Sequence, residues 1–138
     1  MFPLLYAGSL PDCAEVYFTE DNITVGKCRL NVYVAESERQ KMCGMLSFSD
    51  SSFKKDGMIF IGDTPKTNYF HTQGMKMEIR IMGLSKKGDK YYKVNNDAKY
   101  APPGLKQVVI YGDSVFETSE RLYQSELNKC LFSGSGYE

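Results

Sequence analysis

The sequence has no tryptophan, a single histidine and no excess of either charge. Its 17 basic and 17 acidic residues cancel, whereas a nucleic-acid-binding protein of this size normally carries a basic excess or stripe. Nucleic acid is therefore not expected as a partner. No apolar run reaches the length that crosses a bilayer, so no membrane contact is expected either. With one histidine and no Cys-x-x-Cys pair, we expect no metal and no cofactor.

The N-terminal residues do not have the pattern of a signal peptide. Residues 1–8 are apolar, but the run is short, contains Pro3 and has no preceding cation, since the first is Lys27. We therefore expect a cytoplasmic protein or, for a reason given below, one incorporated in a virus particle.

The four cysteines are Cys13, Cys28, Cys43 and Cys130. Four mostly buried free thiols are the expectation. Two disulfides are the alternative if the protein is exported, and the spacing specifies no pairing. A zinc site would need all four thiols from distant positions.

What the sequence does contain is the composition of one globular domain. The 138 residues are 42% hydrophobic and 13% aromatic, which suffices for a substantial core. Short apolar runs alternate with Gly, Pro and Asn turns, which favours a mainly antiparallel β domain, either barrel-like or a sandwich. The expected strands cover 15–19, 23–35, 58–61, 75–81, 91–95, 107–111 and 115–117. A polar turn is expected at 20–22, a bulge at Gly26, a hairpin loop at 85–90 and irregular structure at 96–104.

The clearest strand signal lies at 75–81. Met75, Met77, Ile79 and Ile81 share one face, and Lys76, Glu78 and Arg80 share the other. This period of two predicts a strand with one buried face. Residues 58–61 predict a short apolar strand that is buried on both faces or lies across an open barrel end.

Two short helices are expected. Ser37 and Gln40 form a capping box for a helix near 37–44, which Gly44 ends. Ser119 caps a second helix near 119–130, and its apolar stripe holds Tyr123, Leu127, Cys130 and Leu131. The chain then divides into an N-terminal arm at 1–22, a β domain at 23–117 and a C-terminal helix and tail at 118–138. Both ends are expected to serve as docking segments.

Four short motifs resemble the DUF192 family, also called UPF0127, over roughly residues 28–117. They are Glu38-Arg39 with Gly44-Met45, then Gly57-Met58-Ile59-Phe60, then His71-Thr72 with Gly74-Met75, and finally Gly112-Asp113. The resemblance implies a small β domain of unestablished function. Family members usually have Pro-x-Asp where this chain has Glu78 and Arg80. Many relatives are exported and some occur in tailed-phage genomes, which is the reason for considering a virus particle.

The residues with the most distinctive chemistry are His71, Thr72 and Gly74, with Arg39 from the first helix. A backbone hydrogen bond is the expected role of the imidazole, and ligand contact is the alternative. Cys43 and Asp113 could complete a catalytic set with His71 on paper, but no spacing supports it, so no catalytic residue is assigned. We hypothesise a ligand-binding site at these four residues.

Tyrosines are the most informative surface feature. Several are not accounted for by the buried strand faces: Tyr33, Tyr69, Tyr91 or Tyr92, Tyr100 and Tyr111. Exposed tyrosines on a charge-balanced surface are typical of protein-contacting or carbohydrate-contacting proteins. We therefore expect a non-enzymatic β module that contacts protein subunits, its own or others, as a structural subunit of a larger assembly such as a phage virion. The alternative is a small-ligand or carbohydrate-binding domain with its pocket near His71.

Overall fold

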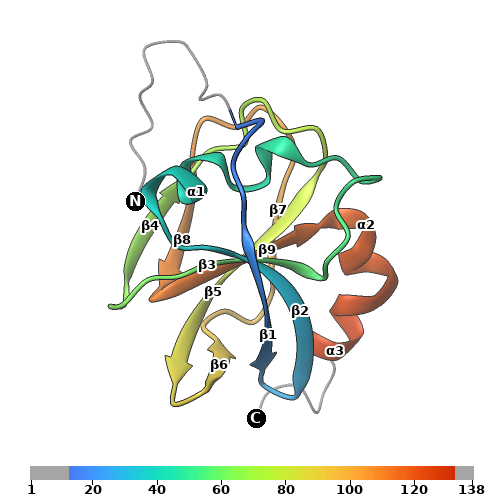
Figure 1. The fold of residues 1–138 in the computed structure, drawn as a ribbon. Helices are drawn as coiled ribbons and strands as arrows, with labels where there is room; N and C mark the ends of the chain where they lie inside the picture. Colours follow the sequence, from blue (N-terminus) through green and yellow to red (C-terminus); the bar gives the residue numbers. More distant parts are fainter. Residues whose placement is uncertain (1–12, 133–138) are drawn as a thin grey trace.

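The computed structural model describes residues 13–132, which fold into nine strands and two short helical regions (Figure 1). The strands are β1 (Thr19–Val25), β2 (Cys28–Ala35), β3 (Gly57–Phe60), β4 (Lys66–Phe70), β5 (Ile79–Lys87), β6 (Lys90–Lys93), β7 (Lys99–Ala101), β8 (Val108–Gly112) and β9 (Ser114–Ser119). The first helical region is α1 (Glu38–Cys43) with the 3-10 turn η1 (Gly44–Ser47). The second comprises α2 (Glu120–Leu122), the π-helical turn η2 (Tyr123–Leu127) and α3 (Asn128–Phe132).

Six strands close into a barrel. Their order is β6-β1-β2-β3-β9-β5, and β6 pairs with β5 to complete the ring, while β7 extends β5 on the outside. Most pairs are antiparallel, but β2 and β3 run parallel, and β1 meets β6 in parallel only at Val25 and Tyr91. Strands β4 and β8 form a separate two-stranded sheet. The predicted mainly β, barrel-like architecture with two short helices is therefore confirmed.

Two hydrophobic cores lie on opposite sides of the barrel wall. One draws on all six barrel strands and on the C-terminal helical region, and it includes Val25, Leu30, Val32, Ile59, Met82, Leu84, Tyr91, Phe116, Tyr123, Leu127 and Leu131. We call this cluster the barrel core. The second cluster, which we call the outer core, joins the outer face of the wall to α1, η1, β4 and β8. It includes Met45, Met58, Phe60, Phe70, Met77, Ile79, Ile81, Ile110 and Val115. Neighbouring residues Met58 and Ile59 enter different cores, so β3 is buried on both faces, as predicted.

The backbone of β8 in the outer sheet packs directly against the backbone of the barrel strand β5 at Gly83. A Cβ atom at this position would stand 1.8 Å from the carbonyl oxygen of Tyr111. Only glycine permits this approach, and it fixes where β8 lies on β5.

The strand predicted at 75–81 begins later than expected. Residues Met77, Ile79 and Ile81 are buried as the period of two predicts, but the strand starts at Ile79 and continues to Lys87. A turn at Gly74, with φ of 82°, precedes it, and the Glu78 carbonyl accepts from the Glu120 amide rather than from a neighbouring strand. Because β5 continues, the loop predicted at 85–90 shrinks to Gly88 and Asp89.

The first hairpin also departs from the prediction. Residues 20–22 lie within β1 instead of forming a polar turn, because one long edge of this strand faces solvent and tolerates polar side chains. Gly26 is in the two-residue turn between β1 and β2, with φ of 59°, so the predicted bulge is wrong. Strands β4 and β7 were not predicted, since five and three residues carry too little periodicity.

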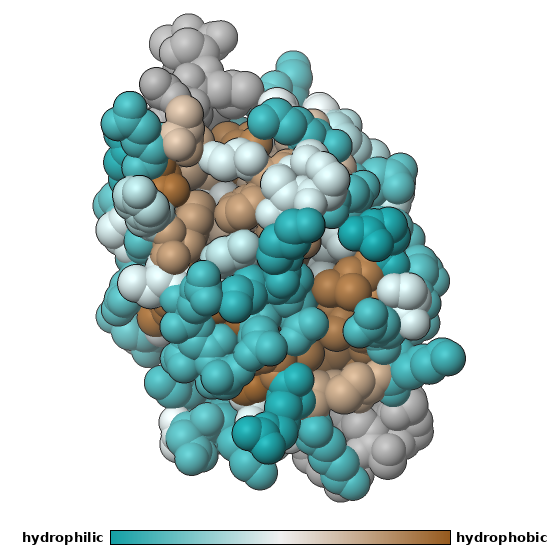
Figure 2. Space-filling view, turned by 45° about the vertical axis from the view of Figure 1, so that its right-hand side comes forward, coloured by the Kyte–Doolittle hydropathy of each residue, from teal (hydrophilic) through white to brown (hydrophobic). Residues whose placement is uncertain are grey.

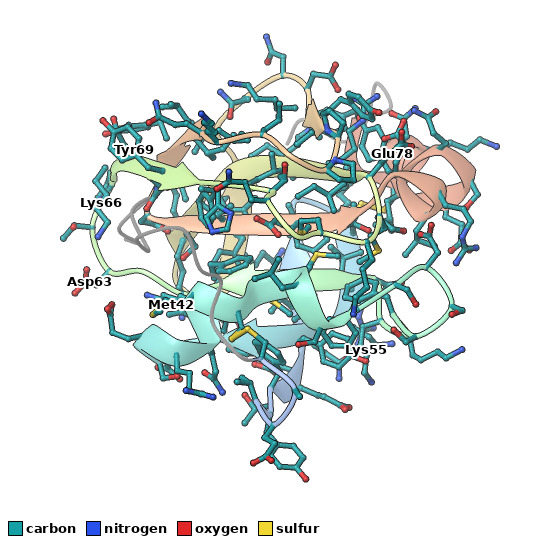
Figure 3. All side chains as sticks on the ribbon, turned by 90° about the horizontal axis from the view of Figure 1, so that it is seen from above. Met42, Lys55, Asp63, Lys66, Tyr69 and Glu78 are labelled. Atoms are coloured by element: carbon teal, nitrogen blue, oxygen red, sulfur yellow. A yellow bond between two sulfur atoms is a disulfide. The ribbon has the colours of Figure 1, made fainter. Side chains whose placement is uncertain are left out.

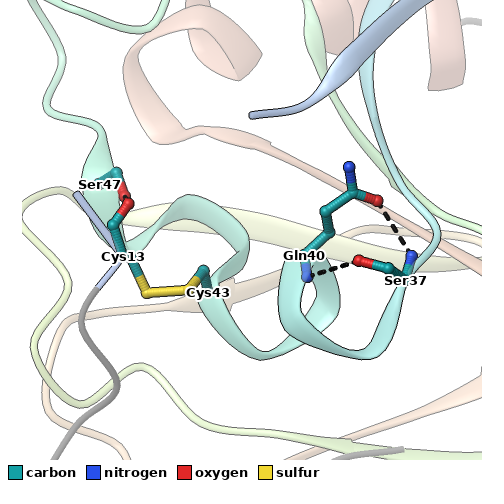
Figure 4. Close-up of a disulfide and its surroundings, with 5 residues drawn as sticks. All are labelled: Cys13, Ser37, Gln40, Cys43 and Ser47. Atoms are coloured by element: carbon teal, nitrogen blue, oxygen red, sulfur yellow. Dashed lines mark hydrogen bonds between the residues drawn. A yellow bond between two sulfur atoms is a disulfide. The ribbon is translucent and has the colours of Figure 1, made fainter. Parts of the chain in front are cut away.

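Both predicted helices are confirmed. Ser37 Oγ accepts from the Gln40 amide at 3.1 Å, and Gln40 Oε1 accepts from the Ser37 amide at 3.0 Å, which forms the capping box (Figure 4). Ser119 caps α2 by accepting from the Leu122 amide. No helix among the described residues has the length and apolar character needed to cross a membrane.

The expectation of free thiols is wrong. Cys13 is bonded to Cys43 on α1 (Figure 4), and Cys28 on β2 is bonded to Cys130 on α3. The pairs are 30 and 102 residues apart in the chain, so only the folded arrangement brings them together. Each disulfide ties a helical region to the rest of the protein.

Candidate functional site

Thr72 fixes the loop at 102–105 through its hydrogen bonds, an arrangement that we call the Thr72 latch. Its hydroxyl donates to the Pro102 carbonyl at 2.6 Å and accepts from the Leu105 amide at 2.8 Å. Its own amide donates to the Leu105 carbonyl, and its carbonyl accepts from the Gly104 amide, both at 2.9 Å. The side chain is buried, so its hydrogen-bonding capacity serves the loop at 102–105 rather than a ligand.

The other predicted site residues do not converge. Gly74 lies exposed in the turn closed by the hydrogen bond from the Met75 amide to the Thr72 carbonyl, and its positive φ is the reason for glycine there. Arg39 is exposed on α1. Of the four predicted residues, His71 lines a small cavity.

That cavity lies under α1 and η1, in the core outside the barrel wall. Its volume is about 20 Å³, which admits roughly one water molecule. It is lined by Lys41, Met42, Cys43, Gly44, Met45, Leu46, Phe60, Phe70, His71, Met75 and Glu117. A second cavity of about 30 Å³ shares Lys41, Phe60 and Phe70 with it and continues towards Lys66, Asp113 and Ser114.

Glu117 is the unexpected residue in this cavity. It lies on β9 between the apolar residues Met58 of β3 and Ile81 of β5, and it is 4% exposed. Its carboxyl makes no hydrogen bond or ion pair with the described residues. Burial raises the pKa of Glu117 to about 8, so the acid is largely protonated at neutral pH.

His71 presents a neutral imidazole to the same cavity. Its Nδ1 accepts from the Gln73 amide at 3.1 Å, so the ring proton of the neutral form is on Nε2. Burial lowers the pKa of His71, which favours this neutral form further. In this tautomer Nε2 donates a hydrogen bond and has no lone pair for a metal.

The structure does not bring His71, Cys43 and Asp113 together as a catalytic set. The Cys43 sulfur is bonded to Cys13 and is no nucleophile in this state. Asp113 lines the second cavity, not the one with His71, and its Oδ2 accepts from the Lys86 amide at 2.9 Å. The cavity therefore places the uncharged groups of His71 and Glu117, together with Lys41, around space for about one water.

A second candidate is the outward face of the two-stranded sheet. Thr67 pairs with Tyr111, and Tyr69 pairs with Val109 across β4 and β8. These four residues, which we call the β4–β8 face, are exposed, with Tyr69 at 41%, Val109 at 40% and Tyr111 at 51%. Figure 3 shows Tyr69 at the rim of the molecule.

Packing and hydrogen bonds support the β4–β8 face from behind. Phe70, Val108 and Ile110 alternate with the exposed residues and enter the outer core. The buried Asn68 amide donates to the carbonyls of Ile110 and Gly112 at 3.2 and 3.1 Å. An open groove of about 560 Å³ runs beside the face. It is lined by Thr67, Val109 and Tyr111 from the sheet, by Asn95 and Asp97 from the loop before β7, and by Lys99 at the start of β7.

The surface tyrosines were partly predicted. Tyr69, Tyr100 and Tyr111 are exposed as expected. Of the pair Tyr91 or Tyr92, Tyr91 is buried and Tyr92 is half-buried. Tyr33 stacks on Phe48 with ring centroids 4.9 Å apart. Arg80, on the polar face of the predicted strand at 75–81, donates from Nε to Glu120 Oε1 at 2.6 Å. Figure 2, which turns the side of the molecule with α2 and α3 forward, shows mainly hydrophilic residues with scattered hydrophobic patches.

Fold and site together define the class: a small disulfide-bonded β-barrel protein with an added outer sheet. No family model matches the chain, and no curated protein matches it significantly. A solved structure from Sinorhizobium meliloti 1021, described as a "putative transcription regulator (R01717)", has a TM-score of 0.56 at 12% identity, over 80% of this chain and 88% of that chain. That similarity shows a shared fold and nothing about activity.

A protein of unknown function from Novosphingobium aromaticivorans DSM 12444 is also similar in structure. Its TM-score is 0.42 at 16% identity, over 85% of this chain and 91% of that chain. The DUF192 resemblance stays a prediction.

Proposed function

We propose that the protein is a non-enzymatic binding module that contacts a partner protein through the β4–β8 face. The observation that carries this proposal is the exposed row of Tyr69, Val109 and Tyr111 on a sheet whose other face is packed in the core. Tyrosine is enriched in protein interfaces because it contributes a large contact area at little cost in side-chain entropy. A face that is ordered before binding loses less entropy when it is covered.

The partner is a protein subunit, and a second copy of this chain is the first one to test. Zero formal charge removes the long-range repulsion that keeps many proteins monomeric. Membership of a larger assembly such as a virion stays a prediction.

We also propose that the protein works in an oxidising compartment, in place of the expected cytoplasm. All four cysteines are in disulfides, and such bonds persist mainly outside the reducing cytosol. Alkylation of the freshly isolated protein without reductant, followed by mass measurement, tests this directly. Four alkylated thiols would contradict it.

Sedimentation of the full chain at micromolar concentrations, with and without the double substitution Tyr69→Ser and Tyr111→Ser, tests the contact surface. We expect the natural chain to associate and the double variant to remain monomeric with unchanged stability, since both side chains are at the surface. Tyr17→Ser is the matched control, because Tyr17 is 88% exposed and lies outside the face.

A natural chain that stays monomeric would exclude the self-contact. A photo-crosslinking side chain at Val109, used in the cells that make the protein, then tests for a different partner. The same crosslinking side chain at Tyr17 is the control. The proposal would be overturned if Val109 gives no cross-linked protein beyond those that Tyr17 also gives.

As a second candidate we propose carbohydrate binding in the groove beside Tyr111 rather than at His71. An aromatic ring next to polar Asn95 and Lys99 suits a sugar ring, and the groove is far larger than the His71 cavity. Glycan-array binding that is lost in both Tyr111→Ser and Asn95→Ala would favour this candidate. The protein contact does not require Asn95.

A further inference from the structure

The sequence contains a single Asn-x-Ser/Thr triplet, Asn22-Ile23-Thr24, and its middle residue is not proline. This triplet is the acceptor motif for N-linked oligosaccharide in exported proteins. A triplet of this kind occurs often by chance, so its position in the fold decides whether it can carry a glycan.

The fold points Asn22 away from the protein. The Ile23 side chain is buried in the barrel core, so its neighbours Asn22 and Thr24 project from the outer surface of β1. Asn22 is exposed, and its side-chain amide makes no hydrogen bond with the described residues. A group attached to Nδ2 would displace no contact.

Asn22 also lies where the barrel has an open strand edge. One edge of β1 pairs with β2 along its whole length, but the other meets β6 only at Val25. The Asn22 amide donates to its neighbour Asp21 Oδ1 at 2.7 Å rather than to a strand. Unpaired edges of this kind invite pairing with other chains unless something covers them.

We propose that Asn22 carries an N-linked oligosaccharide, which covers the open edge of β1. The donor is a lipid-diphosphate-linked oligosaccharide. Asn22 Nδ2 forms a bond to the anomeric carbon, the bond from that carbon to the diphosphate oxygen breaks, and a proton from Nδ2 passes to a base of the transferase. The lipid diphosphate leaves, and no oxidant or reductant is involved.

This inference rests on the oxidising compartment proposed above, where the transferase and the disulfide-forming machinery coincide. It is independent of the β4–β8 face, which lies on other strands. Failure of the glycan test would leave the Tyr69 and Tyr111 experiment untouched, and failure of that experiment would leave the glycan untouched.

The test expresses the full chain behind a cleavable signal peptide in eukaryotic cells, with both the medium and the cell lysate analysed. We expect one added glycan, removed by peptide N-glycosidase, in the natural chain and in Thr24→Ser. Asn22→Gln and Thr24→Val should both lack it. Asn96→Gln is the matched control, because this exposed asparagine is outside any triplet, and it should keep the glycan.

The proposal would be overturned if the natural chain forms its disulfides but has the mass of the bare polypeptide in both the lysate and the medium. Shielding has its own readout. The glycan is removed enzymatically from the folded protein, and the rate of thioflavin-positive aggregation is compared before and after. We expect faster aggregation without the glycan, and equal rates would overturn the shielding role.

Discussion

Two regions of the molecule are built from the same parts in different surroundings. The α1 region contains α1, the Cys13–Cys43 disulfide and Glu117; the α2–α3 region contains α2, η2, α3, the Cys28–Cys130 disulfide and Glu120. Both helical regions begin at a serine cap. The two glutamates are three residues apart, yet one is buried without a partner and the other is paired with Arg80.

The pairing decides the charge of each carboxyl. Arg80 donates two hydrogen bonds to Glu120, and this contact holds the pKa of Glu120 below its usual value despite partial burial. Glu117 has only apolar strand neighbours, and burial alone raises its pKa. The α2–α3 region is therefore fastened by a charged pair, whereas the α1 region covers a neutral acid.

Removing each disulfide in turn compares the two regions at the largest scale. The chain-entropy model gives a loss of about 4 to 5 kcal/mol for Cys28→Ser with Cys130→Ser, and about 3 to 4 kcal/mol for Cys13→Ser with Cys43→Ser. The difference arises because the loops span 102 and 30 residues. Urea unfolding without reductant measures both, and a larger loss for the shorter loop would contradict this order.

Glu117→Gln removes the neutral acid from the α1 region. Folded Glu117 titrates near 8 against a usual 4.5, so between these pH values the folded state holds the extra proton. Stability of the natural chain therefore falls as pH rises across this window, by at most about 1.4 kcal/mol per pH unit. The variant lacks this dependence, so it should match the natural chain near pH 4 and exceed it by about 3 kcal/mol at pH 7.

Urea unfolding from pH 4 to 9 provides that measurement. Glu126→Gln is the control, because Glu126 is exposed on η2, and its curve should run parallel to that of the natural chain. Parallel curves for Glu117→Gln as well would show that the buried acid is not protonated in the folded state.

Arg80→Met breaks the charged pair in the α2–α3 region. The variant leaves the Glu120 carboxylate without its cationic partner, although Gln124 still donates to it. It also loses the bond from Arg80 to the Ala98 carbonyl, so we expect a loss of about 2 kcal/mol at pH 7. Because the folded pKa of Glu120 is lowered, its contribution is present above about pH 4.5 and is lost as pH falls further. The deficit of the variant should shrink in acid.

Arg121→Met is the control for that change. Arg121 approaches Asp50 at 3.9 Å with both side chains largely exposed, and such pairs contribute under about 1 kcal/mol. Thermal unfolding of the two variants compares them, and an equal loss would mean that the Arg80 pair is no stronger than a surface contact.

His71→Asn is expected to have the smallest effect. The asparagine oxygen can replace Nδ1 as acceptor for the Gln73 amide, so stability at pH 8 should hardly change. Burial lowers the pKa of His71, so the natural chain loses stability as pH falls below 6.5, and the variant should lose less. This dependence has the opposite sign to that of Glu117, and unfolding curves at pH 5 and 8 separate them.

The parts of the fold that were predictable are those set by neighbours in sequence. The capping box at Ser37 and Gln40 and the cap at Ser119 involve residues within three positions of each other. The burial of Met77, Ile79 and Ile81 follows from side-chain alternation alone. The start of β5 at Ile79 could not be predicted. The apolar and polar residues alternate from Met75 onwards, but residues 75–78 make no strand pairing.

The features that were missed depend on contacts between distant residues. Both disulfides and the latch from Thr72 to Leu105 join segments 30 or more positions apart. Glu117 did carry a signal in the sequence: Val115 enters the outer core, and period two places Glu117 on the same face. A carboxyl on the inward face of a strand contradicts ordinary preference, and such contradictions often mark strained or functional positions.

The closure of the barrel has a consequence for how the protein opens. Strands β1 and β6 meet at one residue pair, Val25 and Tyr91, with a further hydrogen bond from the Gly26 amide to the Tyr91 carbonyl at 2.8 Å. Every other junction of the ring has at least three paired residues. This short seam should separate before the rest. Among the amides that are hydrogen-bonded between barrel strands, native-state exchange is therefore expected to be fastest at Gly26 and at the neighbouring amides of β6.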